Sequence, residues 1–228
     1  MGLPSVVGHV AAQSTDGNAI TTSSIDTTNA TLLVAGLSYD SVGGPGSPAV
    51  SDSKSNTWVA LTSSGGPGQR SQLYYVKNPV VGTGHTFTGG GTASFPAIFV
   101  VAIRDTDVLA NVDQQNNNFL GSPGTTIQPG SVTPSLDGEA IVTHAGTSQT
   151  GAVLSIDSGF AILDQFPVSP GLAYGGGLAY RIQSAKTADN PTWTSTGAAE
   201  ALCATIATFE PADLPYQPAY QRAPVQAQ

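Results

Sequence analysis

The sequence contains one long segment twice. Residues 84–105 read GHTFTGGGTASFPAIFVVAIRD, and residues 190–211, about 106 positions later, read NPTWTSTGAAEALCATIATFEP. Both copies place an aromatic residue between two threonines, pass through glycine and small residues, and end in a long apolar run. An alternating β-branched segment, a glycine turn and a buried strand predict a hairpin. Its recurrence indicates an internal duplication.

Other segments match in the same order. Residues 142–148 match residues 32–38. Residues 157–164 match 55–62, which places Phe160 at the position of Trp58, and residues 178–181 match 73–76, which places Tyr180 at the position of Tyr75. The offset drifts between segments, as expected when insertions fall in loops. The first predicted strand, 5–13, has no clear counterpart. We therefore expect half-repeats at about 29–113 and 135–211.

Turn-rich segments separate the predicted strands. Residues 114–134 begin QQNNNFLGSPG and are predicted to be a loop that connects the halves. Residues 40–49 and 64–69 are rich in glycine and proline and are predicted to be loops that supply contacts to partners.

Composition favours an all-β fold. The 228 residues include 27 glycines and 16 prolines, and no long stretch has helical apolar spacing. About four strands per half cannot close a core alone, but two halves facing each other can. We predict one domain over 1–211, a jelly-roll-like antiparallel β-sandwich built from two pseudo-repeated halves. Two tandem immunoglobulin-like domains are the alternative.

Residues 212–228 follow a different pattern. They carry Pro215, Pro218 and Pro224, with Tyr216 and Tyr220 between them. Proline at this density favours extended chain. The segment is predicted to be an extended C-terminal arm whose tyrosines dock on a neighbouring subunit, and a disordered tail is the alternative.

The charge balance excludes several partners. Seven Lys and Arg against fifteen Asp and Glu give a net charge of −8. Nucleic acids and anionic membranes both require a basic face, so neither is an expected partner. No apolar run approaches the roughly 20 residues of a membrane span, and no signal peptide is visible. We expect a soluble protein that is not secreted by a signal peptide.

No residue pattern predicts catalysis, a cofactor or a metal. The histidines His9, His85 and His144 are far apart in sequence, and the match of the halves places Pro191 at the position of His85. No zinc motif, paired glutamates or phosphate-binding loop occurs. Asp52, Asp105 and Asp107 are predicted to cap their own turns rather than to bind calcium, and Cys203 is predicted to be a buried thiol.

The aromatic residues divide into core and candidate contact positions. Trp58, Phe87 and Trp193 are predicted to pack in the core, since equivalent halves must share core positions. Neighbouring Tyr74 and Tyr75 point to opposite faces of one strand. Tyr74 is therefore predicted to be exposed or at an interface, and it joins Tyr216 and Tyr220 as a candidate interaction residue.

Three blocks of sequence carry a resemblance: 52–58 (DSKSNTW) leading to 73–78 (LYYVKN), 84–88 (GHTFT), and 204–211 (ATIATFEP). With them the chain resembles β-sandwich modules common in bacteriophage virions and bacterial surface proteins. The resemblance implies a non-enzymatic, surface-displayed module and supplies no catalytic residues. The expected function is a structural protein of a phage virion, either a capsid decoration protein or a tail or fibre component.

The expected virion function implies binding partners and a location. The partners are other copies of the chain and other virion proteins, and the location is the virion after assembly in the host cytoplasm. The alternative is a carbohydrate-binding or adhesin-type module whose partners are host-surface glycans.

Overall fold

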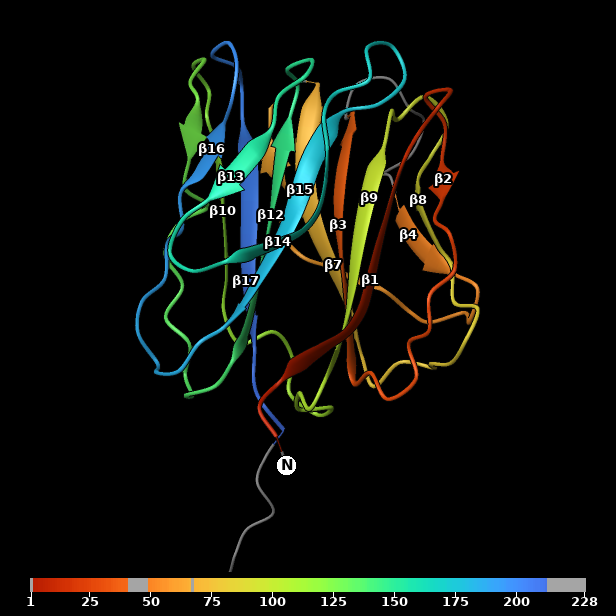
Figure 1. Cartoon of the computed structure of the whole chain (residues 1–228), viewed down its shortest axis with the longest axis vertical. Coiled ribbons are helices and arrows are strands. Elements are labelled where there is room, and N and C mark those ends of the chain that lie inside the picture. Colours follow the sequence, from red (N-terminus) through yellow and green to blue (C-terminus); the bar gives the residue numbers. More distant parts are fainter. Residues whose placement is uncertain (1, 41–48, 67, 213–228) are drawn as a thin grey trace, which may run out of the picture.

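The described part of the chain folds as a stack of four antiparallel β-sheets. The computed structural model describes residues 2–40, 49–66 and 68–212 and contains no helix in those ranges. Two large sheets lie at the centre of the stack, and a small sheet covers the outer face of each (Figure 1). The predicted all-β sandwich is confirmed.

The two central sheets have the same strand order. The first-half sheet runs β1 (Ser5–Gln13), β9 (Ala97–Arg104), β3 (Leu32–Asp40), β7 (Gln69–Lys77) and β5 (Val59–Ala60), with β6 (Ser64–Gly65) also paired to β7. The second-half sheet runs β10 (Gln115–Phe119), β17 (Cys203–Phe209), β12 (Ala140–Thr147), β15 (Gly175–Ile182) and β14 (Ala161–Phe166).

The outer sheets repeat in the same way. One contains β2 (Ile20–Thr21), β8 (Phe87–Gly90) and β4 (Ala49–Asp52), and the other β11 (Thr126–Ile127), β16 (Trp193–Ser195) and β13 (Leu154–Ile156). Each strand of one half therefore has a counterpart in the other except β6. The duplication seen in the sequence is a duplication of topology.

Two predictions about the start of the second half are wrong. Residues 114–134 are not only a connecting loop, because β10 and β11 lie within them. β10 is also the counterpart of the first strand, since β1 pairs with β9 as β10 pairs with β17. The sequence does not reveal β10, because three of its five residues are Asn, which has low strand propensity, and the strand lies at an exposed edge of the sheet.

Each half also closes a core of its own, which the sequence analysis did not predict. One buried cluster lies within the first half and includes Leu33, Leu37 and Phe87, and another lies within the second half around Trp193. A third joins the two central sheets and brings Tyr75 against Phe209, with ring centroids 5.6 Å apart. The burial of Phe87 and Trp193 is as predicted.

Burial on both faces explains the apolar strands. Along β3, Leu32 and Val34 face the central core, whereas Leu33 and Ala35 face the core of the first half. A strand buried on both faces has no polar alternation, so residues 32–37 read as one continuous apolar run.

Contacts at the two outer edges of the central sheets are equivalent. At one edge, Nδ1 of His9 on β1 lies 2.7 Å from Oδ2 of Asp164 on β14. At the other, Oε1 of Gln115 on β10 accepts a hydrogen bond of 3.0 Å from the Thr62 amide, next to β5. The halves therefore pack with an approximate two-fold relation.

Candidate interaction surface at the base of the molecule

The three histidines lie apart, and each has a structural role. His144 is fully buried on β12, where the two central sheets meet. Its Nδ1 lies 2.7 Å from the Ser71 hydroxyl, and its Nε2 lies 3.4 Å from the Ser38 hydroxyl. Burial lowers the pKa of His144 to about 3. A serine beside a histidine resembles part of a hydrolase site, but this pair has no exposed face through which a substrate could reach it.

His85 belongs to a buried network around Asp52. Nε2 of His85 lies 3.2 Å from Oδ1 of Asp52, and Nδ1 lies 2.9 Å from the Thr27 hydroxyl. Asp52 also accepts hydrogen bonds from the Lys54 amide at 2.8 Å and from Trp58 Nε1 at 2.7 Å. Burial lowers the pKa of His85 and the Asp52 carboxylate opposes that shift. The DSKSNTW block is thus a turn organised by one carboxylate.

We expect Asp52→Ala to destabilise the protein by about 2 kcal/mol, because the partly buried donors of Trp58 and of the turn lose their acceptor. The urea midpoint of unfolding measures this change. Asp26→Ala is the matched control, since Asp26 caps the Thr28 amide in an exposed turn, and its effect should be clearly smaller. Equal midpoints for both variants would contradict the role given to Asp52.

The structural counterpart of His85 is Asp189, not Pro191. His85 bridges Ile25 as Asp189 bridges Val132, each with reciprocal backbone hydrogen bonds. Asp189 is buried and pairs with Arg181. Its pKa is raised by burial, against the opposing charge of Arg181. Both halves therefore place a buried side chain with a polar partner here, His85 with Asp52 in one and Asp189 with Arg181 in the other. The predicted match was two residues off because insertions fall in the adjoining loop.

Further sequence candidates for chemistry are also accounted for. Oδ1 of Asp107 accepts hydrogen bonds from the amides of Leu109 and Ala110, as predicted for a turn cap. Cys203 is buried, and burial raises its pKa far above the usual value. Over the described ranges, no group of three or more His, Cys, Asp or Glu side chains could hold a metal ion. The same ranges contain no helix that could span a membrane.

The prediction that Tyr74 is exposed is wrong. Tyr74 and Tyr75 do point to opposite faces, but Tyr74 packs in the core of the first half and Tyr75 in the central core. The Tyr74 hydroxyl donates a hydrogen bond of 2.8 Å to Gln72 Oε1. The expectation failed because sheets cover both faces of β7.

The other predicted contact residues are placed only in part. Tyr216 and Tyr220 lie outside the described residues, as do residues 41–48 of the first predicted contact loop. Ser64 and Gly65 of the second predicted loop form β6.

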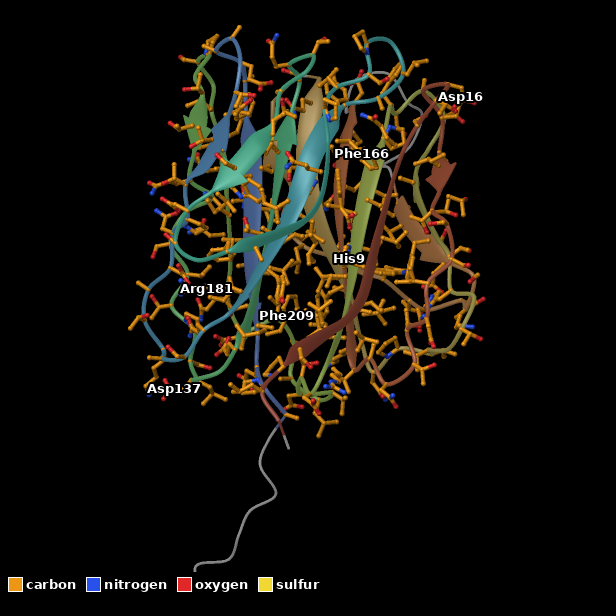
Figure 2. The ribbon with its side chains drawn as sticks, viewed as in Figure 1. His9, Asp16, Asp137, Phe166, Arg181 and Phe209 are labelled. Carbon is orange, nitrogen blue, oxygen red and sulfur yellow. The ribbon has the colours of Figure 1, made fainter. Side chains whose placement is uncertain are left out.

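One end of the molecule presents exposed leucines instead. Leu3 is 64% exposed, Leu109 83% and Leu136 39%. They belong to what we call the base: residues 2–4, 105–113, 134–139 and 210–212. The N-terminus emerges at this end (Figure 1), and Asp137 lies at it while Asp16 lies at the opposite end (Figure 2).

Hydrogen bonds tie the segments of the base together. The Ala212 amide donates to the Asp105 carbonyl at 2.8 Å, and the Asp107 amide donates to the Glu210 carbonyl at 3.0 Å. The Ser135 amide donates to an Asp113 carboxylate oxygen at 2.9 Å. Leu3 lies directly over the 135–138 turn, because a Cβ on Gly138 would stand 2.7 Å from Leu3 Cδ2. The leucines therefore stand on a connected platform.

The base is also acidic. It carries Asp105, Asp107, Asp113, Asp137 and Glu210 at positions that are not buried, and beneath them Glu139, whose pKa burial raises. Nearby cations are already engaged: Lys77 donates to the Leu109 carbonyl at 2.7 Å, and Arg104 Nε donates to the Ser5 hydroxyl at 2.8 Å.

The sequence analysis did not predict the base as a contact surface, although the positions of its leucines indicate it. Each leucine sits in a turn sequence, Gly2-Leu3-Pro4, Asp107-Val108-Leu109 or Leu136-Asp137-Gly138, where no strand could bury it. Apolar side chains that gather on an exposed surface mark interaction sites, whereas single exposed ones are ordinary. Comparison of the chain with protein-family models, with curated proteins and with solved structures finds no match.

Proposed function

We propose that this protein is a non-enzymatic structural component of a bacteriophage virion, either a capsid decoration protein or a tail or fibre component. Its role would be to add contacts between subunits and so to stabilise the particle. The observation that carries the proposal is the base, a connected surface with three exposed leucines on a rigid four-sheet body. Exposed apolar side chains on a connected platform favour a protein partner.

The environments of the reactive side chains support a non-enzymatic role. His144 is sealed between sheets, and His85 is held by Asp52 and Thr27. His9 (labelled in Figure 2) is partly exposed on β1, and it pairs with Asp164 of the other half. Each histidine holds parts of the fold together, which is a structural use of the side chain.

A binding function for glycans is the second candidate, and one observation favours it. At the end opposite the base, a hollow of about 240 Å³ is lined by Asp40, Phe95, Tyr174 and residues of the 168–173 turn. Aromatic rings beside a carboxylate are suited to a sugar ring and its hydroxyls. A glycan array probed with the isolated protein tests this candidate, and Phe95→Ala should abolish any signal.

The virion proposal is tested on particles. Particles purified from a phage with the gene deleted should lose heat stability relative to wild type, and added protein should restore it. Thermal release of the packaged genome measures the effect. Particles that lack the protein in the wild type, or a deletion with unchanged thermal release, would contradict the proposal. A gene located among metabolic genes would do so as well.

A further inference from the structure

The base presents three exposed leucines, and the chain carries a segment whose chemistry fits them. We propose that residues 213–228 of one copy dock on Leu3, Leu109 and Leu136 of a neighbouring copy. This inference rests on the proposed function, because it names the contact by which copies assemble. It assigns the base as the receptor surface and the Pro/Tyr segment as the ligand.

The chemistry of the two surfaces matches. Residues 213–228 read DLPYQPAYQRAPVQAQ, so leucine, valine, two tyrosines and three prolines are spaced mainly by Ala and Gln, and Asp213 and Arg222 are the charged residues. Such a segment can cover exposed leucines and loses little entropy when it docks, because proline already restricts it. Arg222 is its cation, and the base carries carboxylates at Asp105, Asp107 and Asp137. Asp105 already pairs with Arg104 at 3.6 Å, whereas Asp107 and Asp137 accept hydrogen bonds from backbone amides.

The structure fixes where the segment starts. Pro211 forms a bridge to Thr106, and the Ala212 amide is hydrogen-bonded to Asp105. The segment therefore leaves from the same end as the leucines. In two copies whose bases face each other, each segment would begin beside the receptor surface of the other copy.

A neighbouring copy is the better receptor than the same copy. Ala212 is hydrogen-bonded to Asp105, and Leu109 follows Asp105 by four residues, so docking in the same copy would need the segment to reverse soon after Ala212. Pro215 and Pro218 favour extended chain at that place. Extended at about 3.1 Å per residue, the segment would reach roughly 50 Å, which is long enough to cross onto a second base.

The first experiment compares the full chain with a chain that stops at Ala212. Light scattering should give a dimer or larger assembly for the full chain and a monomer for the shortened one. In the full chain, Leu109→Glu should also give a monomer, since it places a charge among the leucines and the acidic side chains. Val153→Glu is the matched control, because Val153 is 54% exposed in a loop outside the base, and it should assemble as wild type.

A labelled peptide of residues 212–228 provides the direct measurement. Its fluorescence anisotropy should rise on titration with the shortened chain, and Leu109→Glu should weaken binding by at least about tenfold while Val153→Glu leaves it unchanged. Circular dichroism checks that both variants fold. A monomeric full chain, an assembly that survives removal of 213–228, or peptide binding insensitive to Leu109→Glu would each overturn the proposal.

The outcomes also separate this proposal from the proposed function. If the shortened chain still joins virions, the docking proposal fails and the virion role stands. If the peptide binds as described but virions never contain the protein, the virion role fails and the contact stands.

Discussion

Gly36→Ala is expected to destabilise the protein by about 3 kcal/mol, at the upper end for overpacking a core. A Cβ on Gly36 would stand 2.6 Å from Cδ2, 2.7 Å from Cγ and 3.0 Å from Cβ of His144. Neither partner can move easily, because Gly36 is paired with β7 and β9 on both sides and the imidazole is held by Ser71. The two residues are near the pseudo-two-fold axis, so the halves would be forced apart where they meet.

Two further variants test whether the contact between residue 36 and His144 causes the loss of stability in Gly36→Ala. Gly91→Ala is the control, since a Cβ there meets nothing within 4 Å, and its urea midpoint should equal that of wild type. Combining Gly36→Ala with His144→Ala should cost clearly less than the sum of the single changes, because the imidazole that clashes is gone. Additive losses would contradict the packing of His144 over Gly36.

Stability is expected to fall by about 3 kcal/mol between pH 7 and pH 4 through His144 alone. In the folded protein its pKa is lowered to about 3 by burial, against 6.5 in the exposed residue. Below pH 6.5 the unfolded chain therefore binds a proton that the folded chain does not. The stabilising contribution is fully present above pH 6.5 and is lost progressively as pH falls toward 3.

His144→Gln tests this expectation, because glutamine keeps a polar side chain between Ser38 and Ser71 but does not titrate. The unfolding free energy of this variant should vary much less than that of wild type between pH 6.5 and pH 4.5. Some dependence should remain from His85, whose pKa burial also lowers. The carboxylates with lowered pKa values, such as Asp52, act at lower pH. Parallel pH profiles for variant and wild type would contradict the role of His144.

The sequence was sufficient to predict the fold class and the duplication. Three pairs, Phe87 with Trp193, Trp58 with Phe160 and Tyr75 with Tyr180, occupy equivalent places in the structure, since their strands pair with the same registers in each half. Packing constrains the core positions in both halves, so these positions retain the sequence similarity that reveals the duplication.

The layer structure could not be predicted from these patterns. The outer sheets are built from strands of two to four residues, such as β2 and β11, which are too short to show any periodicity. A prediction that omits the outer sheets leaves the outer face of each central sheet exposed, so it places Tyr74 on an exposed face. The same omission leaves the packing of the two halves against each other as the only predicted way to close a core.

The candidate site was predicted in part only. Segment 212–228 stands out through its prolines and tyrosines, but the sequence does not reveal the surface that we propose as its receptor. Exposure of Leu109 depends on how the 105–113 loop lies against Glu210 and Ser135, which are contacts between residues distant in sequence. The local sequence pattern does not predict contacts between residues that are distant in the chain.

Quantitative mass spectrometry of purified phage particles tests the central claim most directly, namely that this protein assembles into a virion through its base. Phages that encode the wild-type chain, Leu109→Glu or Val153→Glu would be compared for copies of the protein per particle. Wild type and Val153→Glu should be incorporated equally, and Leu109→Glu should fall at least about tenfold while it remains folded in the lysate. Equal incorporation of all three chains, or particles that contain none of them, would contradict the account.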